Sequence, residues 1–172
     1  MNRISFALIL CILILSLSAC SVNTISSKER ILDTIEKSEF PVMYIESDIP
    51  QGANLCLSRE DGRFAVFTHR DYEIIQEIFL ADSTNDAFIH ISGKTSAELK
   101  PILAGNFPFE KYRCTWTTAG ESGTNLWQSV LFFDGTFYYS ISVQCPVEKA
   151  GTYENEFSDL LSRAELCSIS YY

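Results

Sequence analysis

Two long runs of alternating residues, on either side of Asp134-Gly135, constrain the fold of this chain more than any other feature of its sequence. The runs are Asn125–Phe133 and Thr136–Cys145, and both are rich in the aromatic and β-branched residues that favour strands. Asp-Gly between such runs is a strong signal for a β-hairpin with a two-residue turn. The cross-strand pairs that this turn predicts are Phe132 with Phe137, Val130 with Tyr139, and Leu126 with Val143.

The alternation gives this hairpin two faces of different composition. The residues of one face form a continuous apolar surface, which comprises Val130, Phe132, Ile141, Val143 and Cys145. The opposite face also carries large apolar side chains, namely Trp127, Leu131, Phe133 and Tyr138. A monomeric protein rarely leaves such a large apolar patch in water. We therefore expect that another element covers part of the second face, or that this face binds a partner.

Two further segments complete the C-terminal half of the chain. Lys111–Thr118 alternates as a third strand, which places Tyr112, Cys114 and Trp116 on one face. A helix is predicted from about Thr152 to Leu166, and its apolar residues recur at helical spacing: Tyr153, Phe157, Leu160, Leu161 and Ala164. We expect this helix to lie across the core face of the meander. The predicted fold class is α+β, with an antiparallel sheet packed by the C-terminal helix and one or two shorter helices.

The beginning of the predicted domain has weaker patterns. Lys28–Lys37 places apolar residues on one side of a brief helix. An extended stretch follows over Val42–Glu46, after a proline. Ala53–Ser58 and Phe64–His69 then form a candidate hairpin around a polar, glycine-containing turn.

The middle of the chain contains the segment that is hardest to assign. Tyr72–Ala81 fits both a helix and a strand, and the sequence leaves the two open. A polar turn over Asp82–Asp86 then leads to a predicted strand over Ala87–Ser92. A capping-box pattern opens a short helix over Thr95–Leu103, which Pro101 must break or bend.

The end of the chain resembles a known group of domains. A tyrosine-rich strand after the Asp-Gly turn leads to a proline and then to a helix with Phe157 and Leu160-Leu161. This pattern, which covers about residues 125–166, is similar to the ending of Mog1/PsbP-like domains. The resemblance implies an α+β fold of a kind that is common among small bacterial lipoproteins and usually non-enzymatic. It transfers no functional residue to this chain.

The N-terminus has the features of an export signal. Arg3 supplies a positive charge, Ile4–Leu15 is apolar except for one serine, and small residues follow. The run closes on Leu17-Ser18-Ala19-Cys20, which resembles a bacterial lipobox. The resemblance implies that the Cys20 thiol receives a diacylglyceryl group and that residues 1–19 are removed. Two alternatives remain open, an ordinary secretory signal cleaved after Ala19 and an uncleaved anchor.

Lipidation at Cys20 would determine where the protein is found. Two acyl chains anchor a protein stably, because each buried methylene contributes about 0.8 kcal/mol. We expect residues 20–27 to form a polar tether and residues 28–172 a single domain. The expected location is the cell membrane or outer membrane, through lipid such as palmitate on Cys20, with the domain facing outside the cytoplasm.

The charge of the chain excludes one class of partner. The full sequence has a formal net charge of −9, and loss of Arg3 with the signal makes it more negative. Such a domain is repelled by phosphate backbones. We therefore expect no nucleic acid as a partner, and we expect a partner protein of the envelope instead.

The remaining cysteines point to an oxidising compartment. Once the signal is removed and one cysteine carries lipid, an even set is left, comprising Cys56, Cys114, Cys145 and Cys167. We expect one or two structural disulfides among them, with any of three pairings. Four buried free thiols are the alternative. CxxC spacing is absent and histidines are scarce, so neither a redox motif nor a zinc site is predicted.

Candidate catalytic residues are few. Gly120-Glu121-Ser122-Gly123 lacks the spacing of a nucleophile elbow and reads as a hairpin turn. Asp82–Asp86 lacks the glycine and the bidentate glutamate of a calcium loop, so we read it as a solvated turn. His69 reads as a surface residue at a strand end, and His90 as a residue on the polar face of a strand. No cofactor or metal site is predicted.

Two hypotheses for the function follow. The first is a membrane-anchored, non-enzymatic binding or assembly module with an exposed aromatic surface at Trp127, Phe133 and Tyr138. Trp116 and Tyr171-Tyr172 are further candidates for this surface. The second is a small envelope hydrolase that uses His69 or His90 as a general base. An exposed aromatic patch would favour the first, and a histidine beside a carboxylate or hydroxyl in a cleft would favour the second.

Overall fold

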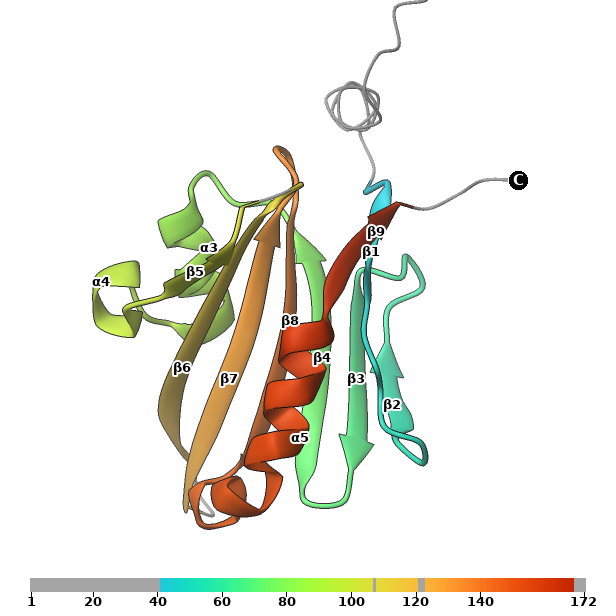
Figure 1. The fold of residues 1–172 in the computed structure, drawn as a ribbon, viewed down its shortest axis with the longest axis vertical. Coiled ribbons are helices and arrows are strands. Elements are labelled where there is room, and N and C mark those ends of the chain that lie inside the picture. Colours follow the sequence, from blue (N-terminus) through green and yellow to red (C-terminus); the bar gives the residue numbers. More distant parts are fainter. Residues whose placement is uncertain (1–40, 107, 121–122, 169–172) are drawn as a thin grey trace, which may run out of the picture. The chain divides into compact units, whose positions relative to one another are not determined.

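A seven-stranded antiparallel sheet with helices on both faces forms the body of the domain, in a computed structural model that describes residues 41–106, 108–120 and 123–168 (Figure 1). All of these residues belong to one compact unit, residues 31–172. The strand order is β2-β3-β4-β8-β7-β6-β5, and β1 and β9 pair separately. The predicted α+β class is therefore confirmed. The predicted signal, tether and first helix, and Tyr171-Tyr172, lie outside the described residues.

The first four strands settle the ambiguous segment. β1 is Met43–Glu46, and the predicted hairpin is present as β2 (Asn54–Ser58) and β3 (Phe64–His69). The segment that fitted helix and strand is β4 (Tyr72–Phe79), which pairs with β3 on one side and with β8 on the other. A strand is favoured here because β4 lies inside the sheet, where β-branched and aromatic side chains pack on both faces.

The segment after β4 corrects our prediction of a polar turn followed by a strand. Thr84–Ser92 forms the helix α3. The Ser83 hydroxyl accepts a hydrogen bond from the Asp86 backbone N–H and caps the N-terminus of the helix. Gly93 ends it with φ +70°, a conformation that glycine adopts without strain. Both caps are local signals for a helix, and they outweigh the strand-like residue types between them.

The next predicted helix is shorter than expected. The capping box is present, but α4 spans only Ser96–Leu99. Lys100 has φ +52°, and the proline that follows cannot continue the helix. The chain then forms the edge strand β5, Ile102–Gly105.

The C-terminal meander is present, with a correction to its register. Its strands are β6 (Glu110–Gly120), β7 (Gly123–Phe133) and β8 (Tyr138–Pro146). The observed pairs of β7 and β8 include Phe132 with Tyr139, Val130 with Ile141, and Leu126 with Cys145, which is two residues away from the predicted register. Because side chains alternate with a period of two, this shift leaves every residue on its predicted face.

The position of the turn explains the shift. The Asp134 N–H donates to the Phe137 carbonyl at 3.2 Å, so the two residues at the centre of the turn are Gly135 and Thr136. Gly135 has φ +105°, and a glycine first in a two-residue turn is a common hairpin arrangement. Asp134 therefore precedes the turn instead of forming half of it.

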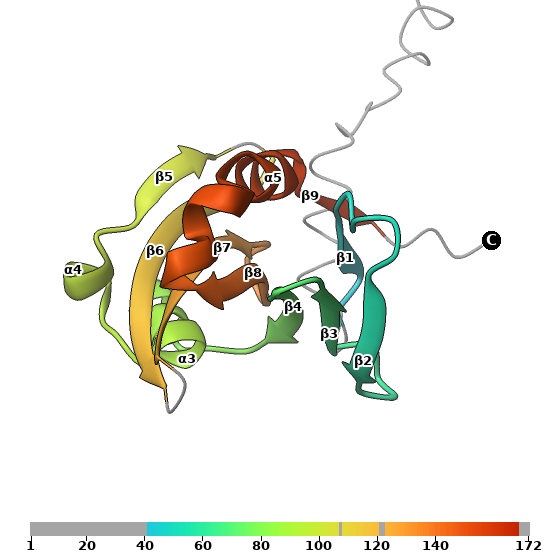
Figure 2. The same ribbon diagram turned by 90° about the horizontal axis from the view of Figure 1, so that it is seen from below.

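The C-terminal helix packs on the sheet as predicted and ends earlier than predicted. A short 3-10 turn, Val147–Lys149, leads into α5 (Ala150–Arg163), and β9 (Glu165–Ser168) then pairs with β1. Figure 2 shows α5 on one side of the sheet and α3 on the other.

Each face of the sheet has its own core. The core under α5 includes Ile74, Val130, Phe132, Tyr139, Ile141, Val143, Tyr153, Phe157, Leu160 and Leu161. The smaller core under α3 and α4 comprises Phe79, Ala87, Phe88, Leu99, Cys114, Trp116, Leu131 and Tyr138. The expectation that an element covers the second apolar face of the hairpin is thus confirmed, and that element is α3. None of the helices in the described ranges has the length and apolar character needed to cross a membrane.

Candidate functional site

The predicted aromatic surface is largely covered. Tyr138 is only 3% exposed, because Phe79 and Phe133 stack on its ring and the Thr84 hydroxyl lies 3.1 Å from its own hydroxyl. Trp127 and Phe133 are half-buried. The expected surface of Trp127, Phe133 and Tyr138 is therefore corrected, since these rings serve mainly to pack the core under α3.

The expected disulfides are also corrected. Cys56, Cys114, Cys145 and Cys167 are all free thiols in the structure. Cys114 and Cys145 belong to the cores on opposite faces of the sheet, so the sheet itself separates them. Burial raises the pKa of the Cys114 thiol to about 12, and burial also raises the pKa of the Cys145 thiol.

The two histidines lie in ordinary surroundings. His90 is on α3, not on a strand, and its ring stacks on Phe79 while its Nε2 lies 3.1 Å from a Glu77 oxygen. His69 ends β3, where its ring meets the edge of Tyr72. Neither histidine lines either of the cavities described below. The geometry therefore gives no support to the hydrolase hypothesis.

The predicted polar turns are used by the fold. Asp86 helps to cap the N-terminus of α3 through its backbone N–H and its carboxylate, which both bond to Ser83. Gly120 and Gly123 pair across the β6–β7 hairpin, and the two turn residues between them lie outside the described residues. Within the described ranges, no three His, Cys, Asp or Glu side chains gather as they would around a metal ion.

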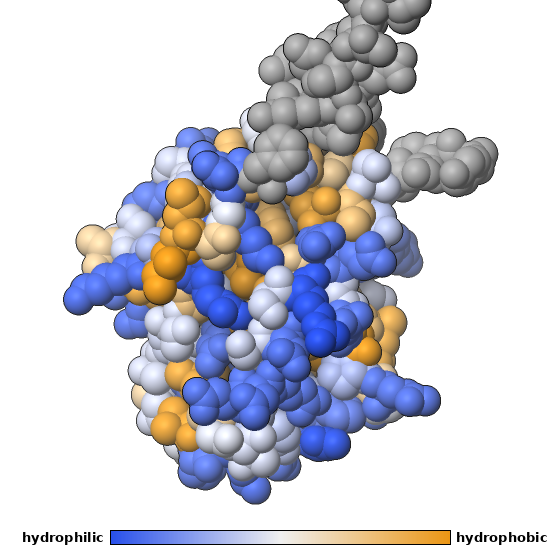
Figure 3. Space-filling model, viewed as in Figure 1, coloured by the Kyte–Doolittle hydropathy of each residue, from blue (hydrophilic) through white to orange (hydrophobic). Residues whose placement is uncertain are grey.

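An open cavity of about 310 Å³ lies where the C-terminal end of α5 meets the β5–β6 hairpin. Its lining comes from three separate parts of the chain and comprises Ala104, Gly105, Pro108, Phe109, Lys111, Phe132, Ala164, Glu165 and Leu166. Figure 3 shows apolar surface gathered in this part of the molecule, between β5 and β9. Most of the lining residues are apolar, and the charged ones are Lys111 and Glu165. We take this cavity as the candidate functional site.

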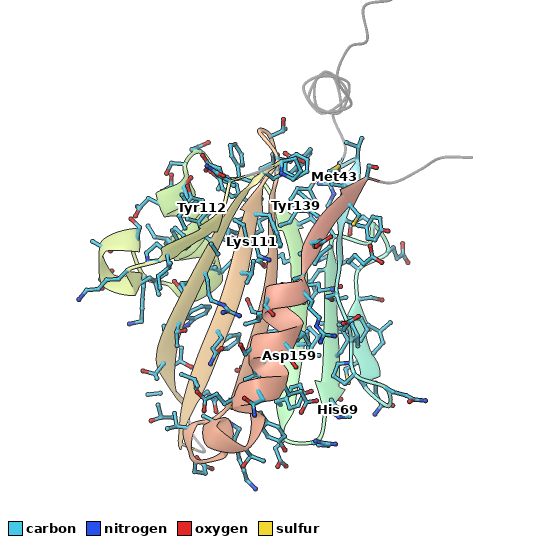
Figure 4. All side chains as sticks on the ribbon, in the orientation of Figure 1. Met43, His69, Lys111, Tyr112, Tyr139 and Asp159 are labelled. Carbon is cyan, nitrogen blue, oxygen red and sulfur yellow. The ribbon has the colours of Figure 1, made fainter. Side chains whose placement is uncertain are left out.

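Lys111 is the polar centre of the cavity (Figure 4). Its ammonium donates to the Ser162 carbonyl at 3.1 Å and to the Ala164 carbonyl at 2.8 Å, and so satisfies the last carbonyls of α5. The same nitrogen lies 5.3 Å from the centre of the Phe132 ring. Burial, together with the neighbouring charge of Arg113, lowers the pKa of Lys111.

This geometry can bind a ligand that is apolar with one hydrogen-bond acceptor. A lysine ammonium has three N–H donors, and two of those of Lys111 are used by helix carbonyls. The third is left for a carboxylate or another oxygen in the cavity. The sequence identified Lys111 only as the first residue of an alternating strand, because the residues that surround it are far apart in the chain.

A second cavity, of about 240 Å³, lies at the other end of the sheet. It is polar, and its lining comprises Thr68, Arg70, Asp71, Tyr72, Glu73, Asn125, Gln144, Cys145 and Pro146. Two of its charged groups are in ion pairs, since Arg70 lies 3.6 Å from Glu156 and Asp71 lies 3.5 Å from Lys149. The third, Glu73, accepts a hydrogen bond from the Gln144 side chain. Since each of these groups already has a partner within the protein, we regard this cavity as the weaker candidate.

Comparison with known proteins identifies the fold. No protein-family model matches the chain, and no curated protein sequence matches it. Among solved structures, LpqN aligns over 83% of this chain and 97% of its own length, with a TM-score of 0.50 and 10% identity. The chain shares the fold of LpqN. That protein is involved in cell envelope biogenesis of Mycobacterium tuberculosis.

Two other structures align less closely. One, from Bacteroides thetaiotaomicron, covers 74% of this chain and 46% of its own, with a TM-score of 0.48 and 10% identity. A mutant of the protein Mog1 covers 69% of this chain and 81% of its own, with a TM-score of 0.41 and 15% identity.

Proposed function

We propose that this chain is a lipid-anchored protein of the bacterial cell envelope, whose domain faces outside the cytoplasm and binds a partner without catalysing a reaction. The sequence Leu17-Ser18-Ala19-Cys20 at the end of an apolar run supports the anchor. The shared fold with LpqN, a protein of cell envelope biogenesis, supports the same location. The membrane is then a partner through the lipid on Cys20.

The observation that carries the binding role is the cavity around Lys111, whose lining residues are mostly of apolar type. An apolar cavity that contains a few well-placed polar groups is the usual form of a binding site. Here the polar group is an ammonium held in position by the end of α5. The ligand that fits is an apolar group with an anionic or accepting end, belonging to a small molecule or to an envelope protein.

Hexanoate, a short apolar chain with a carboxylate, is a suitable probe for this cavity. We expect that titration of the full-length protein in detergent shifts the backbone amide signals of Gly105 and Leu166, which line the cavity, in NMR spectra. Ala104→Trp should remove the response because the indole fills the space. Lys111→Met should weaken hexanoate binding by about tenfold, which corresponds to the loss of one charged contact.

Val147→Trp is the matched control, since Val147 is exposed and lies outside the cavity lining. This variant should respond to hexanoate as the unmodified protein does. Hexanol, which lacks the charge, should bind more weakly than hexanoate. Shifts that are spread over the whole domain, or that persist unchanged in Ala104→Trp, would contradict binding in this cavity.

A further inference from the structure

The two ends of the sheet present different surfaces. At one end, β5 forms a wall of the cavity around Lys111, because Ala104 and Gly105 line it. The two preceding residues of this strand, Ile102 and Leu103, are 68% and 55% exposed, and Figure 3 shows the apolar surface that they give to this part of the molecule. At the other end, the lining of the second cavity is polar. We call β5 together with the cavity around Lys111 the β5 end, and the opposite end the far end.

The chain enters the described part of the domain at the β5 end. β1 begins at Met43, two residues after Pro41. Two residues further along the strand, Ile45 pairs with Leu166, which lines the cavity. The strand β1 therefore lies directly beside a wall of the cavity. Figure 1 shows the start of β1 in the same half of the molecule as β5, and the start of α5 in the opposite half.

Twenty residues separate this entry point from the proposed lipid. They are residues 21–40, between Cys20 and Pro41. A chain of this length spans at most about 70 Å, however it is arranged. An anchored domain therefore stays near the bilayer, and the limit is tightest for the end at which the tether enters. The bilayer is thus the surface that the β5 end is held against.

The charges near β5 do not select for an anionic partner or against a neutral one. The cations of β6, Lys111 and Arg113, donate to carbonyls of α5. Lys100, just before β5, and Glu165, in the cavity lining, are of opposite sign. The whole chain has a net charge of −9, which disfavours an anionic surface. A zwitterionic bilayer, contacted through apolar side chains, fits these charges best.

We propose that the β5 end rests on the outer surface of the bilayer in which the lipid on Cys20 is inserted. Ile102 and Leu103 then lie among the lipid headgroups, where water still reaches the backbone of the edge strand. The domain thus has a fixed orientation on the membrane, with the far end directed away from it. This inference rests on the proposed lipid anchor, and it does not depend on which ligand the cavity binds.

Paramagnetic broadening from the bilayer surface tests this contact. The lipidated full-length protein is reconstituted in phosphatidylcholine nanodiscs that contain a few gadolinium-chelating lipids. We expect loss of the amide NMR signals of Leu103, Gly105 and Leu166, and no broadening of the signal of Arg70 at the far end. Concentrated NaCl should leave this difference unchanged, because the contact is apolar and is not screened by salt. The comparison of the two ends needs no variant.

Leu103→Asp should reduce the broadening at Gly105 severalfold, because a carboxylate at this position opposes contact with lipid. Val147→Asp is the matched control, since Val147 is 43% exposed and follows Pro146, which lines the second cavity. It should leave the pattern unchanged. Equal broadening at the two ends, equal effects of the two variants, or a pattern that NaCl removes would each overturn the proposal while leaving the anchor intact. Protein that does not enter the nanodiscs would refute the anchor itself, and this inference with it.

Discussion

Asp134 is a carboxylate with only 2% of its surface exposed, and each of its contacts holds the β7–β8 turn. One oxygen accepts hydrogen bonds from the N–H groups of Thr136 and Phe137, both at 2.8 Å. The other accepts from the Tyr139 hydroxyl at 2.7 Å. A buried charge is tolerated only when it is bonded in this way. Asp134 therefore determines the register of the hairpin on which both cores are built.

We predict that Asp134→Ala lowers the free energy of unfolding by about 3 kcal/mol, because it leaves buried donors without an acceptor. Tyr139→Phe should cost about 1.5 kcal/mol, since it removes one of the bonds to the carboxylate. Urea unfolding followed by circular dichroism measures both. Asp159→Ala, on the exposed side of α5, should stay within about 0.5 kcal/mol of the unmodified protein. If Asp134→Ala lowered the free energy of unfolding no more than Asp159→Ala does, the turn would not depend on this carboxylate.

The thiols also differ from residue to residue. Because the thiolate is the reactive form, a raised pKa slows reaction at neutral pH. Cys56 is exposed on an edge strand, whereas the Cys167 pKa is raised to about 11 by burial and by the nearby Glu46 carboxylate. We predict that a disulfide reagent modifies Cys56 first and Cys167 more slowly. Cys114 and Cys145 should react only after unfolding, as peptide mapping by mass spectrometry would detect.

The rate of reaction at Cys167 should rise with pH, because more thiolate forms as the pH approaches its raised pKa. Rapid modification of Cys114 in the native protein would contradict its placement in the core under α3. If no free thiol were recovered even after unfolding, the cysteines would form the disulfides that their number led us to expect.

At the scale of elements, long apolar patterns predicted the correct secondary structure, and short patterns did not. The strands of the meander and the helix α5 each bury a whole face, and this burial gives their sequences a long, regular apolar pattern. The pattern predicted which of these elements are strands and which is a helix. α3 was missed because its residues, such as Ile89 and Ile91, favour strands. The deciding features were Ser83 and Gly93, which cap the helix at its two ends. Single caps of this kind are easily read as parts of turns.

Neighbouring positions on α3 test its role as the cover of the second face. Phe88 is almost fully buried in the core under α3, whereas Ile89 is exposed. We predict that Phe88→Ala lowers the free energy of unfolding by about 3–5 kcal/mol, since it opens a cavity in the core. Ile89→Ala should cost much less, because its side chain is already in water. Similar costs for the two variants in urea unfolding would mean that α3 does not pack as described.

At the scale of the whole molecule, the sheet separates the two cores from each other and the two cavities from each other. Its two faces hold the two cores, and its two ends hold the two cavities. The fold class was predicted from the sequence, but the candidate site was not. Its lining comes from three distant segments, and only the completed fold brings Lys111, Phe109 and Leu166 together. The aromatic residues that looked functional in the sequence serve mainly in packing.

We propose that Cys20 carries lipid and anchors the domain outside the cytoplasm. Metabolic labelling of a bacterial host with an alkyne fatty acid, followed by intact mass measurement, tests it most directly. We expect that the protein is labelled and begins at Cys20, and that Cys11→Ala behaves in the same way. Cys20→Ala should lose the label and keep residues 1–19. An unlabelled protein, or a Cys20→Ala variant that is labelled and processed as before, would show that Cys20 is not the site of the lipid.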